Sequence, residues 1–270
     1  MLIYHVTWNA VGDQLVSKDR FRWGKMVTSK STRRPPPPDT GLHAPGMLRD
    51  VHAVSWGVFL KVVSFPATPN KPLTVGVAAP ATQSGHLQFR ADRDYVLKAK
   101  FVEYRGDIFS ANGFSVGVNV RSGPATTDDL VFRISAALKV VPDQKDPTKP
   151  TLNLNMPGAN PAGDKNLIKA RPGSTDPLYS VPAVDFALLN GNTNPFTVAL
   201  RLHFPANYIT ASVECAGKSF ERHGDIVQGT DLSTVFQQRE FNVAGVQLAL
   251  QGTEAEVICQ EFTVSEELPI

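Results

Sequence analysis

From Pro195 to Val264 the chain alternates apolar and polar residues with a period of two, and shorter stretches upstream do the same. In residues 114–121, for example, Phe114, Val116, Val118 and Val120 are separated by small or polar residues. This alternation is typical of antiparallel strands that bury one face and expose the other. Strands are therefore predicted at 51–65, 73–79, 86–90, 95–104, 114–121, 130–140, 196–204, 209–220, 241–251 and 254–264, with one or two more within 1–30.

These strands predict an all-β protein: a two-sheet antiparallel β-sandwich, or jelly roll, forming a single domain over residues 1–270. In the C-terminal half, placing Phe204 opposite Ile209 brings the apolar residues of two strands together. The same register leaves Arg201 opposite Ser212 on the polar face, and a shift of one residue would bury the arginine. Gly252-Thr253 predicts a tight hairpin between the last two strands.

Two segments lack this periodicity. Residues 31–50 contain four consecutive prolines, Pro35 to Pro38, and predict an extended connection, either a spacer or a ligand for a proline-recognition domain. Residues 142–182 contain eight prolines and one short strand-like piece at 151–155. This long Pro-rich loop insertion is either a functional loop that covers a site or makes an interface, or an insertion without a role.

Charge and hydropathy exclude several classes of partner. The formal net charge is only +2, with both signs interspersed, so no nucleic-acid partner is predicted. The apolar run at 51–65 is broken by Ser55, Lys61 and Ser64, so no membrane insertion is predicted either. Residues 1–6 do not resemble a signal peptide, and no Asn-x-Ser/Thr acceptor occurs. These features favour a cytoplasmic or virion-like setting, or a mature form from which a signal peptide has been removed.

The cysteines and histidines predict no cofactor. Strand parity points Cys215 inward and Cys259 outward, which favours two thiols over a disulfide. The six histidines are scattered and have no partner at metal-ligand spacing, so no metal site is predicted.

Four strand segments together resemble the concanavalin A-like lectin/glucanase superfamily. They are 94–101 (DYVLKAKF), 113–121 (GFSVGVNVR), the hairpin 196–203 (FTVALRLH) with 208–218, and 257–264 (VICQEFTV), and the resemblance spans about 85–265. It implies a sandwich that carries ligands across the concave outer face of one sheet. The glucanase Glu-x-Asp-x-x-Glu strand, the alginate-lyase Arg-x-Glu-x-Arg strand and the Asp/Asn metal loop of legume lectins are all missing, so no catalytic residue is predicted.

The candidate ligand-binding residues are the polar residues of the strands expected at the centre of the sheets, because planar donors and acceptors match pairs of sugar hydroxyls. Trp23, between Arg22 and Lys25, is the candidate stacking platform. The alternative interpretation is an ordinary solvated sheet face with an Arg201–Glu214 cross-strand pair. The set is Asn119, Arg121, Arg133, Arg201, His203, Glu214, Gln247 and Trp23.

Three functions remain open at this level. The first is a non-catalytic module that binds carbohydrate or another surface ligand. The second is a structural or assembly protein, such as a virion or appendage component, that clasps neighbours in a homo-oligomer through 31–50 and 142–182. The third is a lyase or isomerase that uses Arg201, His203 and Glu214.

Overall fold

The computed structural model describes most strands of the chain and one helix. The described residues are 2–6, 8–11, 14–17, 22–28, 47–54, 57–64, 73–78, 89–106, 114–121, 133–141, 151–155, 158–159, 168–170, 182–185, 195–226, 231–237, 246–252 and 254–269. Within these residues every paired strand is antiparallel. The predicted two-sheet antiparallel β-sandwich is therefore confirmed.

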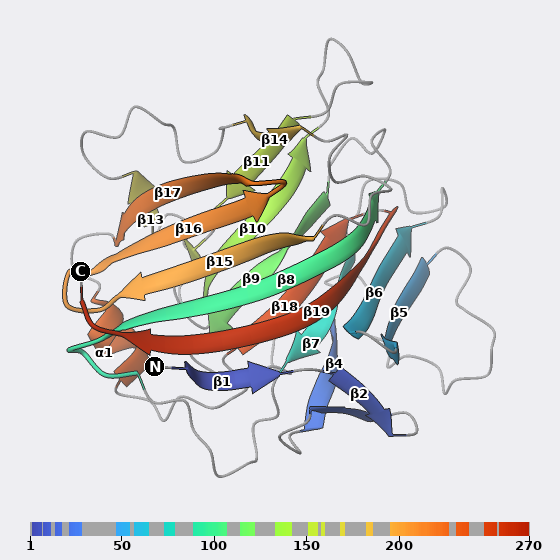
Figure 1. Ribbon diagram of the computed structural model, residues 1–270, viewed down its shortest axis with the longest axis horizontal. Helices are drawn as coiled ribbons and strands as arrows, with labels where there is room; N and C mark the ends of the chain where they lie inside the picture. The colour runs from blue at the N-terminus through green and yellow to red at the C-terminus, as the bar shows by residue number, and fades with distance from the viewer. Residues whose placement is uncertain are drawn as a thin grey trace.

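One layer is a nine-stranded sheet (Figure 1). Its strands, in spatial order, are β13 (Ile168–Ala170), β17 (Lys218–Ile226), β16 (Tyr208–Cys215), β15 (Phe196–His203), β8 (Asp94–Gly106), β19 (Glu254–Glu267), β6 (Gly57–Ser64) and β5 (Met47–Val54), and β1 (Leu2–Val6) also pairs with β19.

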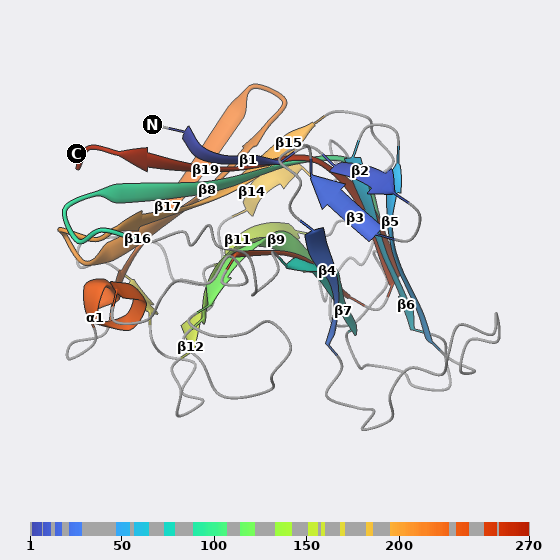
Figure 2. The ribbon, with the colours of Figure 1, turned by 90° about the horizontal axis from the view of Figure 1, so that it is seen from below.

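The other layer is a ten-stranded sheet, which bends into an arch whose hollow side faces away from the first sheet (Figure 2). Its strands, in spatial order, are β14 (Pro182–Asp185), β11 (Thr151–Asn155), β10 (Arg133–Val141), β9 (Phe114–Arg121), β18 (Val246–Gly252), β7 (Leu73–Ala78), β4 (Arg22–Thr28), β3 (Gln14–Ser17) and β2 (Trp8–Val11), and β12 (Gly158–Ala159) also pairs with β10.

The core fills the space between the two sheets with the apolar residues of the alternating strands. Leu97 and Leu200 from one sheet and Val118 and Ile134 from the other are almost completely buried. Burying each such side chain contributes about 1.5–3 kcal/mol to folding. The alternation in the sequence therefore reports directly which face of each strand lies in the core.

One end of the sandwich is closed by four aromatic rings and a short helix, α1 (Leu232–Gln237). Neighbouring rings have centroids 4.6–6.4 Å apart, and Phe236 of α1 is only 1% exposed. The first turn of α1 is capped by Asp231, whose Oδ1 accepts from the Ser233 backbone N–H at 2.7 Å. We call these rings the aromatic end cluster: Phe89, Tyr95, Phe204 and Phe236.

The β15–β16 hairpin has the predicted faces but a different register. Leu202 lies opposite Ile209 and Arg201 opposite Thr210, two residues away from the predicted partners. The difference arises because the turn begins at Phe204, whose carbonyl accepts from the Asn207 N–H. A shift of two residues exchanges partners and keeps every side chain on its predicted face.

Three predicted strands and one predicted hairpin are wrong. The run at 51–65 is two paired strands, β5 and β6, and the run at 209–220 ends at a turn in which Ala216 and Gly217 have positive φ, followed by β17. Gly252-Thr253 does not form a hairpin, because β18 and β19 belong to different sheets. Residues 89 and 90, the described part of the strand predicted at 86–90, are not in a strand.

The segment 142–182 is less irregular than the sequence predicts. The strand expected at 151–155 is β11, and β12 and β13 also lie inside the segment. β11 pairs with β10 and β13 pairs with β17, so the segment extends both sheets. Of the Pro-rich connection 31–50, residues 47–50 belong to β5, and 31–46 lie outside the described residues.

Both cysteines are buried thiols. The predicted outward orientation of Cys259 is wrong, because a bulge between Cys259 and Glu261 resets the parity of β19 and places Cys259 opposite Phe101. Phe101 stacks on Phe196, which in turn lies opposite Cys215. Burial raises the pKa of the Cys215 thiol above its ordinary value.

The aromatic end cluster yields a first testable prediction. Replacing Phe236 by Ala should lower the free energy of unfolding by about 3–5 kcal/mol, because the ring leaves a cavity among Phe89 and Phe204. Leu268→Ala is the matched control, since Leu268 is 72% exposed and its loss should cost less than about 0.5 kcal/mol. Urea unfolding followed by circular dichroism measures both, and equal effects would contradict the packing described.

Candidate functional site

The predicted ligand-binding residues do not form one surface. Because the sheets pack face to face, their outer faces point in opposite directions, and the expectation of a single polar face is wrong. The ten-stranded sheet holds Asn119, Arg121, Arg133, Gln247 and Trp23, and the nine-stranded sheet holds Arg201, His203 and Glu214.

The outer face of the nine-stranded sheet carries a chain of hydrogen-bonded side chains that crosses β8, β15, β16 and β17. His203 Nδ1 lies 2.7 Å from Asp94 Oδ2, and His203 Nε2 lies 3.1 Å from Thr210 Oγ1. Thr210 Oγ1 lies 3.3 Å from His223 Nδ1, and His223 Nε2 lies 3.0 Å from Glu221 Oε1. We call these five residues the polar chain.

The inner part of the polar chain is buried. Asp94 is 1% exposed, His203 4% and Thr210 5%, whereas His223 and Glu221 are exposed. Tyr208 covers the His203 ring, with the two centroids 3.9 Å apart and the planes 15° from parallel. Burial lowers the pKa of His203, and the Asp94 carboxylate opposes that effect in part.

With His203 neutral, as its lowered pKa indicates, the hydrogen bonds assign the protons of this chain. A neutral His203 donates from Nδ1 to the Asp94 carboxylate, so its Nε2 must accept, and the only donor available on Thr210 is the hydroxyl. This is also the connectivity of a hydrolase triad. Thr210 lies inside β16, however, with β15 and β17 paired on either side, so the neighbouring backbone N–H groups belong to the sheet and cannot form an oxyanion hole. The buried threonine is therefore no nucleophile.

Arg201 has a different partner from the predicted one. It forms an ion pair with Glu267 of β19, reaching over β8, whereas Glu214 lies opposite Thr197 and Ser219. The predicted Arg201–Glu214 pair is wrong, because the register shift of two moves Glu214 away from the arginine. His203 likewise meets Asp94 and not Glu214.

The sequence pattern does not reveal the roles of Asp94 and His223. Asp94 directly precedes a predicted strand, but only the pairing of β8 with β15 places it opposite His203. His223 lies in β17, whose first residues fall within the strand predicted at 209–220. One signal could have suggested Asp94. It is a charged residue at the start of a strand, and alternation places it on the outer face, as it does His203.

The outer face of the ten-stranded sheet presents polar positions beside a row of small residues. Along one line across the strands, Gln247, Asn119 and Ser135 are consecutive partners, and Arg121 lies opposite Arg133 two residues further along. The neighbouring line, which we call the small-residue row, consists of Gly76, Ala249, Gly117 and Ala137. On its other side the next line is Thr74, Gln251, Ser115 and Lys139.

Gly117 is required by the close approach of β9 and β10. A Cβ built on Gly117 would overlap the Ala136 carbonyl oxygen and lie 2.7 Å from the Ala137 Cα. Both are backbone atoms that cannot move aside cheaply, so only glycine fits at this position.

Trp23 does not share this face by register. Gly24 is the β4 residue that aligns with Ala78 and, through it, with Gln247. Trp23 is one residue away and therefore belongs to the opposite face, that of Val77 and Leu248.

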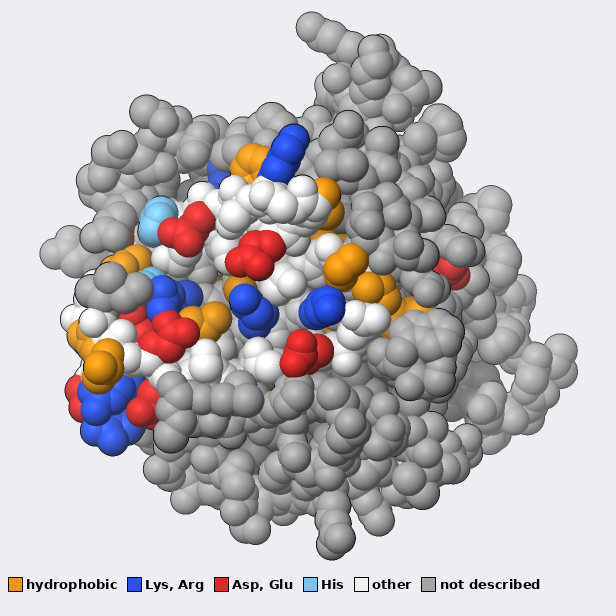
Figure 3. Space-filling view, viewed as in Figure 1, with side chains coloured by type: hydrophobic (Ala, Val, Ile, Leu, Met, Phe, Trp, Pro, Cys, Tyr) orange, Lys and Arg blue, Asp and Glu red, His pale blue; other side chains and the backbone are white. Residues whose placement is uncertain are grey.

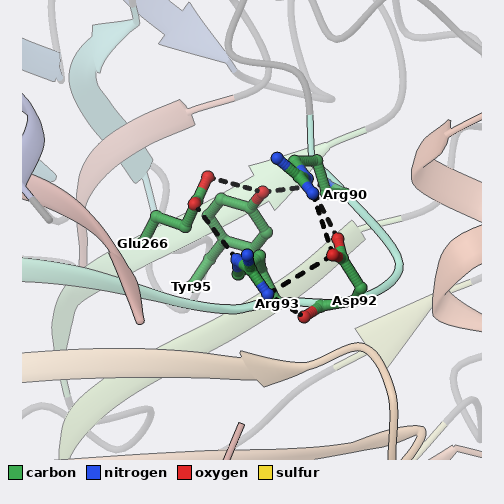
Figure 4. A network of polar contacts seen from close by, with 5 residues as sticks. All are labelled: Arg90, Asp92, Arg93, Tyr95 and Glu266. Carbon is green, nitrogen blue, oxygen red and sulfur yellow. Dashed lines mark hydrogen bonds and ion pairs between the residues drawn. The ribbon is translucent and has the colours of Figure 1, made fainter. Parts of the chain in front are cut away.

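A charged cluster joins the start of β8 to the end of β19 (Figure 4). Arg90 binds Asp92 with N–O distances of 2.8 and 2.9 Å, and Arg93 lies 3.3 Å from Asp92 and 3.5 Å from Glu266. The Arg90 hydrogen bond lowers the pKa of Asp92. The Tyr95 hydroxyl donates to Glu266 Oε2 at 3.2 Å and accepts from the Arg90 backbone N–H at 2.8 Å. Burial above all raises the pKa of Tyr95 to about 12.

The charges on the outer face of the nine-stranded sheet are mixed (Figure 3). Acidic and basic side chains alternate over it and do not gather into a patch of one sign. Among the described residues no group of three His, Cys, Asp or Glu side chains could hold a metal ion. No helix in the described part of the chain has the length and hydropathy needed to span a membrane.

Comparisons with known proteins find similar structures but no related sequence. No family model and no curated protein sequence matches the chain. An endo-1,3-beta-glucanase from Streptomyces sioyaensis is similar over 100% of this chain and 97% of its own, with 8% identity and a TM-score of 0.47. A peanut lectin with a 9mer peptide matches over 92% and 99%, with 13% identity and a TM-score of 0.43.

A lectin from Bauhinia forficata in complex with GalNAc covers 83% of this chain and 100% of its own, with 12% identity and a TM-score of 0.43. Lectins and glucanases are also the classes of protein that the strand pattern resembles. At these identities and TM-scores the likenesses assign no ligand, residue role or activity to this chain.

The charged cluster predicts how stability changes in alkali. An unfolded tyrosine ionises near pH 10, whereas Tyr95 in the folded protein keeps its proton until about pH 12. Stability should therefore fall as the pH rises from 10 to 12, because the unfolded state releases a proton that the folded state retains. Tyr95→Phe should show a shallower loss over that interval in thermal unfolding measured against pH. An unchanged alkaline slope would refute the assignment.

Proposed function

We propose that this protein is a non-catalytic binding module that holds a carbohydrate on the outer face of its ten-stranded sheet. The observation that carries the proposal is the alignment of Gln247, Asn119 and Ser135 along one side of the small-residue row. Amide and hydroxyl groups donate and accept at once, as the vicinal hydroxyls of a sugar require. Arg121 and Arg133 occupy opposite positions two residues further along these strands, and their guanidinium groups are always protonated donors.

The dimensions of this surface suit a sugar ring. Residues that share a face of a strand repeat about every 6.6 Å, so the two polar lines on either side of the small-residue row are about 13 Å apart. Glycine and alanine between them have no side chain beyond Cβ that would stand between a ring and the backbone, and the sheet curves toward that side (Figure 2). A ring lying along the small-residue row would have hydrogen-bonding groups on both of its edges.

The polar side chains on the outer face of the nine-stranded sheet bind one another, which favours the ten-stranded sheet as the binding surface. His203 is bonded to Asp94 and Thr210, and Arg201 is paired with Glu267, so these groups already bind one another. A lyase or isomerase there would need a histidine and a carboxylate in an accessible pocket, and His203 is buried. The assembly hypothesis is weakened because β11, β12 and β13 of the segment 142–182 pair within the chain's own sheets.

The proposal predicts which face is sensitive to substitution. After a glycan array identifies a bound sugar, Asn119→Ala and Gln247→Ala should each weaken binding about three- to tenfold, because each removes one or two hydrogen bonds. Isothermal titration calorimetry measures the dissociation constants, and circular dichroism checks that the variants are folded.

Glu214→Ala is the matched control, since Glu214 is an exposed strand residue on the opposite outer face. Its dissociation constant should match that of the wild type. An empty array with folded protein, or an equal loss in Glu214→Ala, would reject the proposed surface. In the second case the binding face would be the nine-stranded sheet.

A further inference from the structure

The polar chain and the aromatic end cluster lie on opposite faces of the same strand ends. Asp94 and Tyr95 are consecutive at the start of β8, and His203 and Phe204 are consecutive at the end of β15. Because successive side chains of a strand alternate, Asp94 and His203 face outward while Tyr95 and Phe204 enter the cluster. A displacement of the backbone at these strand ends therefore moves both pairs.

The same end of the sandwich holds α1 in place. Asn207, in the turn between β15 and β16, accepts from the Leu232 backbone N–H through its Oδ1 at 3.0 Å. Leu232 and Phe236 of α1 are each 1% exposed. The polar chain, the turn and the helix thus form one connected unit.

The hydrogen bonds of the polar chain are all satisfied when its two imidazoles together carry one extra proton, and the lowered pKa of His203 leaves that ring neutral. The hydroxyl proton of Thr210 goes to His203 Nε2, so Thr210 Oγ1 accepts from His223 Nδ1–H. A protonated His223 then also donates from Nε2 to Glu221 Oε1. In this state one imidazole carries a positive charge and every link has one donor and one acceptor.

A second proton breaks this arrangement. With His203 also protonated, its Nε2–H and the Nδ1–H of His223 both point at the single oxygen of Thr210. The threonine proton then has no acceptor in the chain, and two cations are separated by one hydroxyl group. The hydrogen bonds of the polar chain are therefore compatible with one extra proton on its two imidazoles but not with two.

We propose that the polar chain is a pH-sensitive switch. A second proton breaks its hydrogen bonds, so that the end of the sandwich loosens and the aromatic end cluster becomes accessible to solvent. This role lies apart from the proposed sugar surface, which is on the other sheet.

The charged and titratable groups around His203 set the direction of the response. The described neighbours on its face are Asp94 on β8, Arg201 on β15, Tyr208 and the hydroxyl of Thr210 on β16, His223 and Asp225 on β17, and Glu267 on β19. Burial lowers the pKa of His203 most, Arg201 and His223 lower it further, and Asp94 raises it. The net effect is a lowered pKa.

The sign of the pH dependence follows from that direction. An unfolded histidine takes up a proton near pH 6.5, whereas His203 in the folded protein does so only at a lower pH. Between the two values the open state binds a proton that the closed state does not, so stability is lost as the pH falls. One linked proton corresponds to an opening equilibrium that grows up to about tenfold per pH unit.

Hydrogen exchange followed by mass spectrometry tests this proposal on the full chain. Between pH 7.5 and 5.0, protection factors corrected for intrinsic rates should fall in peptides covering 94–106, 203–215 and 231–237. Peptides from β10 (Arg133–Val141) should change less. In His203→Phe, which keeps a ring against Tyr208, the additional loss in these peptides should disappear. His52→Gln, a histidine substitution in β5, should behave as the wild type.

A second measurement covers the case in which His203→Phe does not fold. Nitrogen chemical shifts of the histidine rings in the wild type should show His203 as a neutral Nδ1–H tautomer at pH 7, titrating below pH 6.5. In Thr210→Val, which keeps both imidazoles without the hydroxyl, protonating one ring should no longer shift the nitrogens of the other. A charged His203 at pH 7, or the same pH-dependent exchange in wild type and His203→Phe, would overturn the proposal.

Discussion

The pairing of β8 with β15 on one side and β19 on the other is the constraint on which the rest of the structure depends. Tyr95, Leu97, Ala99 and Phe101 alternate along β8 and are fully buried, so the strand can meet its neighbours with only one face inward. A slip of one residue would place lysines in the core and rings in water. Once this register is set, Asp94 must face His203, and Phe101 must stack on Phe196.

Because local alternation carries this information, much of the fold could be predicted from the sequence. The positions of β8, β9, β15 and β19, and the face that each strand buries, follow from apolar residues at every second position. Strand partners could not be predicted in this way. Alternation does not reveal that β18 and β19 belong to different sheets. It also does not reveal the bulge in β19, so the inward orientation of Cys259 does not follow from it. Both errors concern relations between distant segments.

The candidate site shows the same limit. Asn119, Arg133 and Gln247 are polar strand residues, and the sequence identifies them by parity alone. Grouping them with Arg201 and His203 required knowledge of sheet membership, which depends on the β9–β18 and β8–β15 pairings. Asp94 escaped notice because its importance comes from one partner 109 positions away. The two outer faces therefore differ. On the nine-stranded sheet the polar side chains bind one another, whereas on the ten-stranded sheet polar positions lie beside a row of small residues.

The bond from Asn207 to α1 has an evolutionary consequence. Surface turns usually accept insertions readily, because few contacts depend on their length. Here the side chain of a turn residue with positive φ accepts from the first residue of a helix 25 positions later. An insertion between Phe204 and Tyr208 would move that oxygen and leave the helix N–H without its acceptor. In natural relatives this turn should therefore keep its length while other connections in the chain vary.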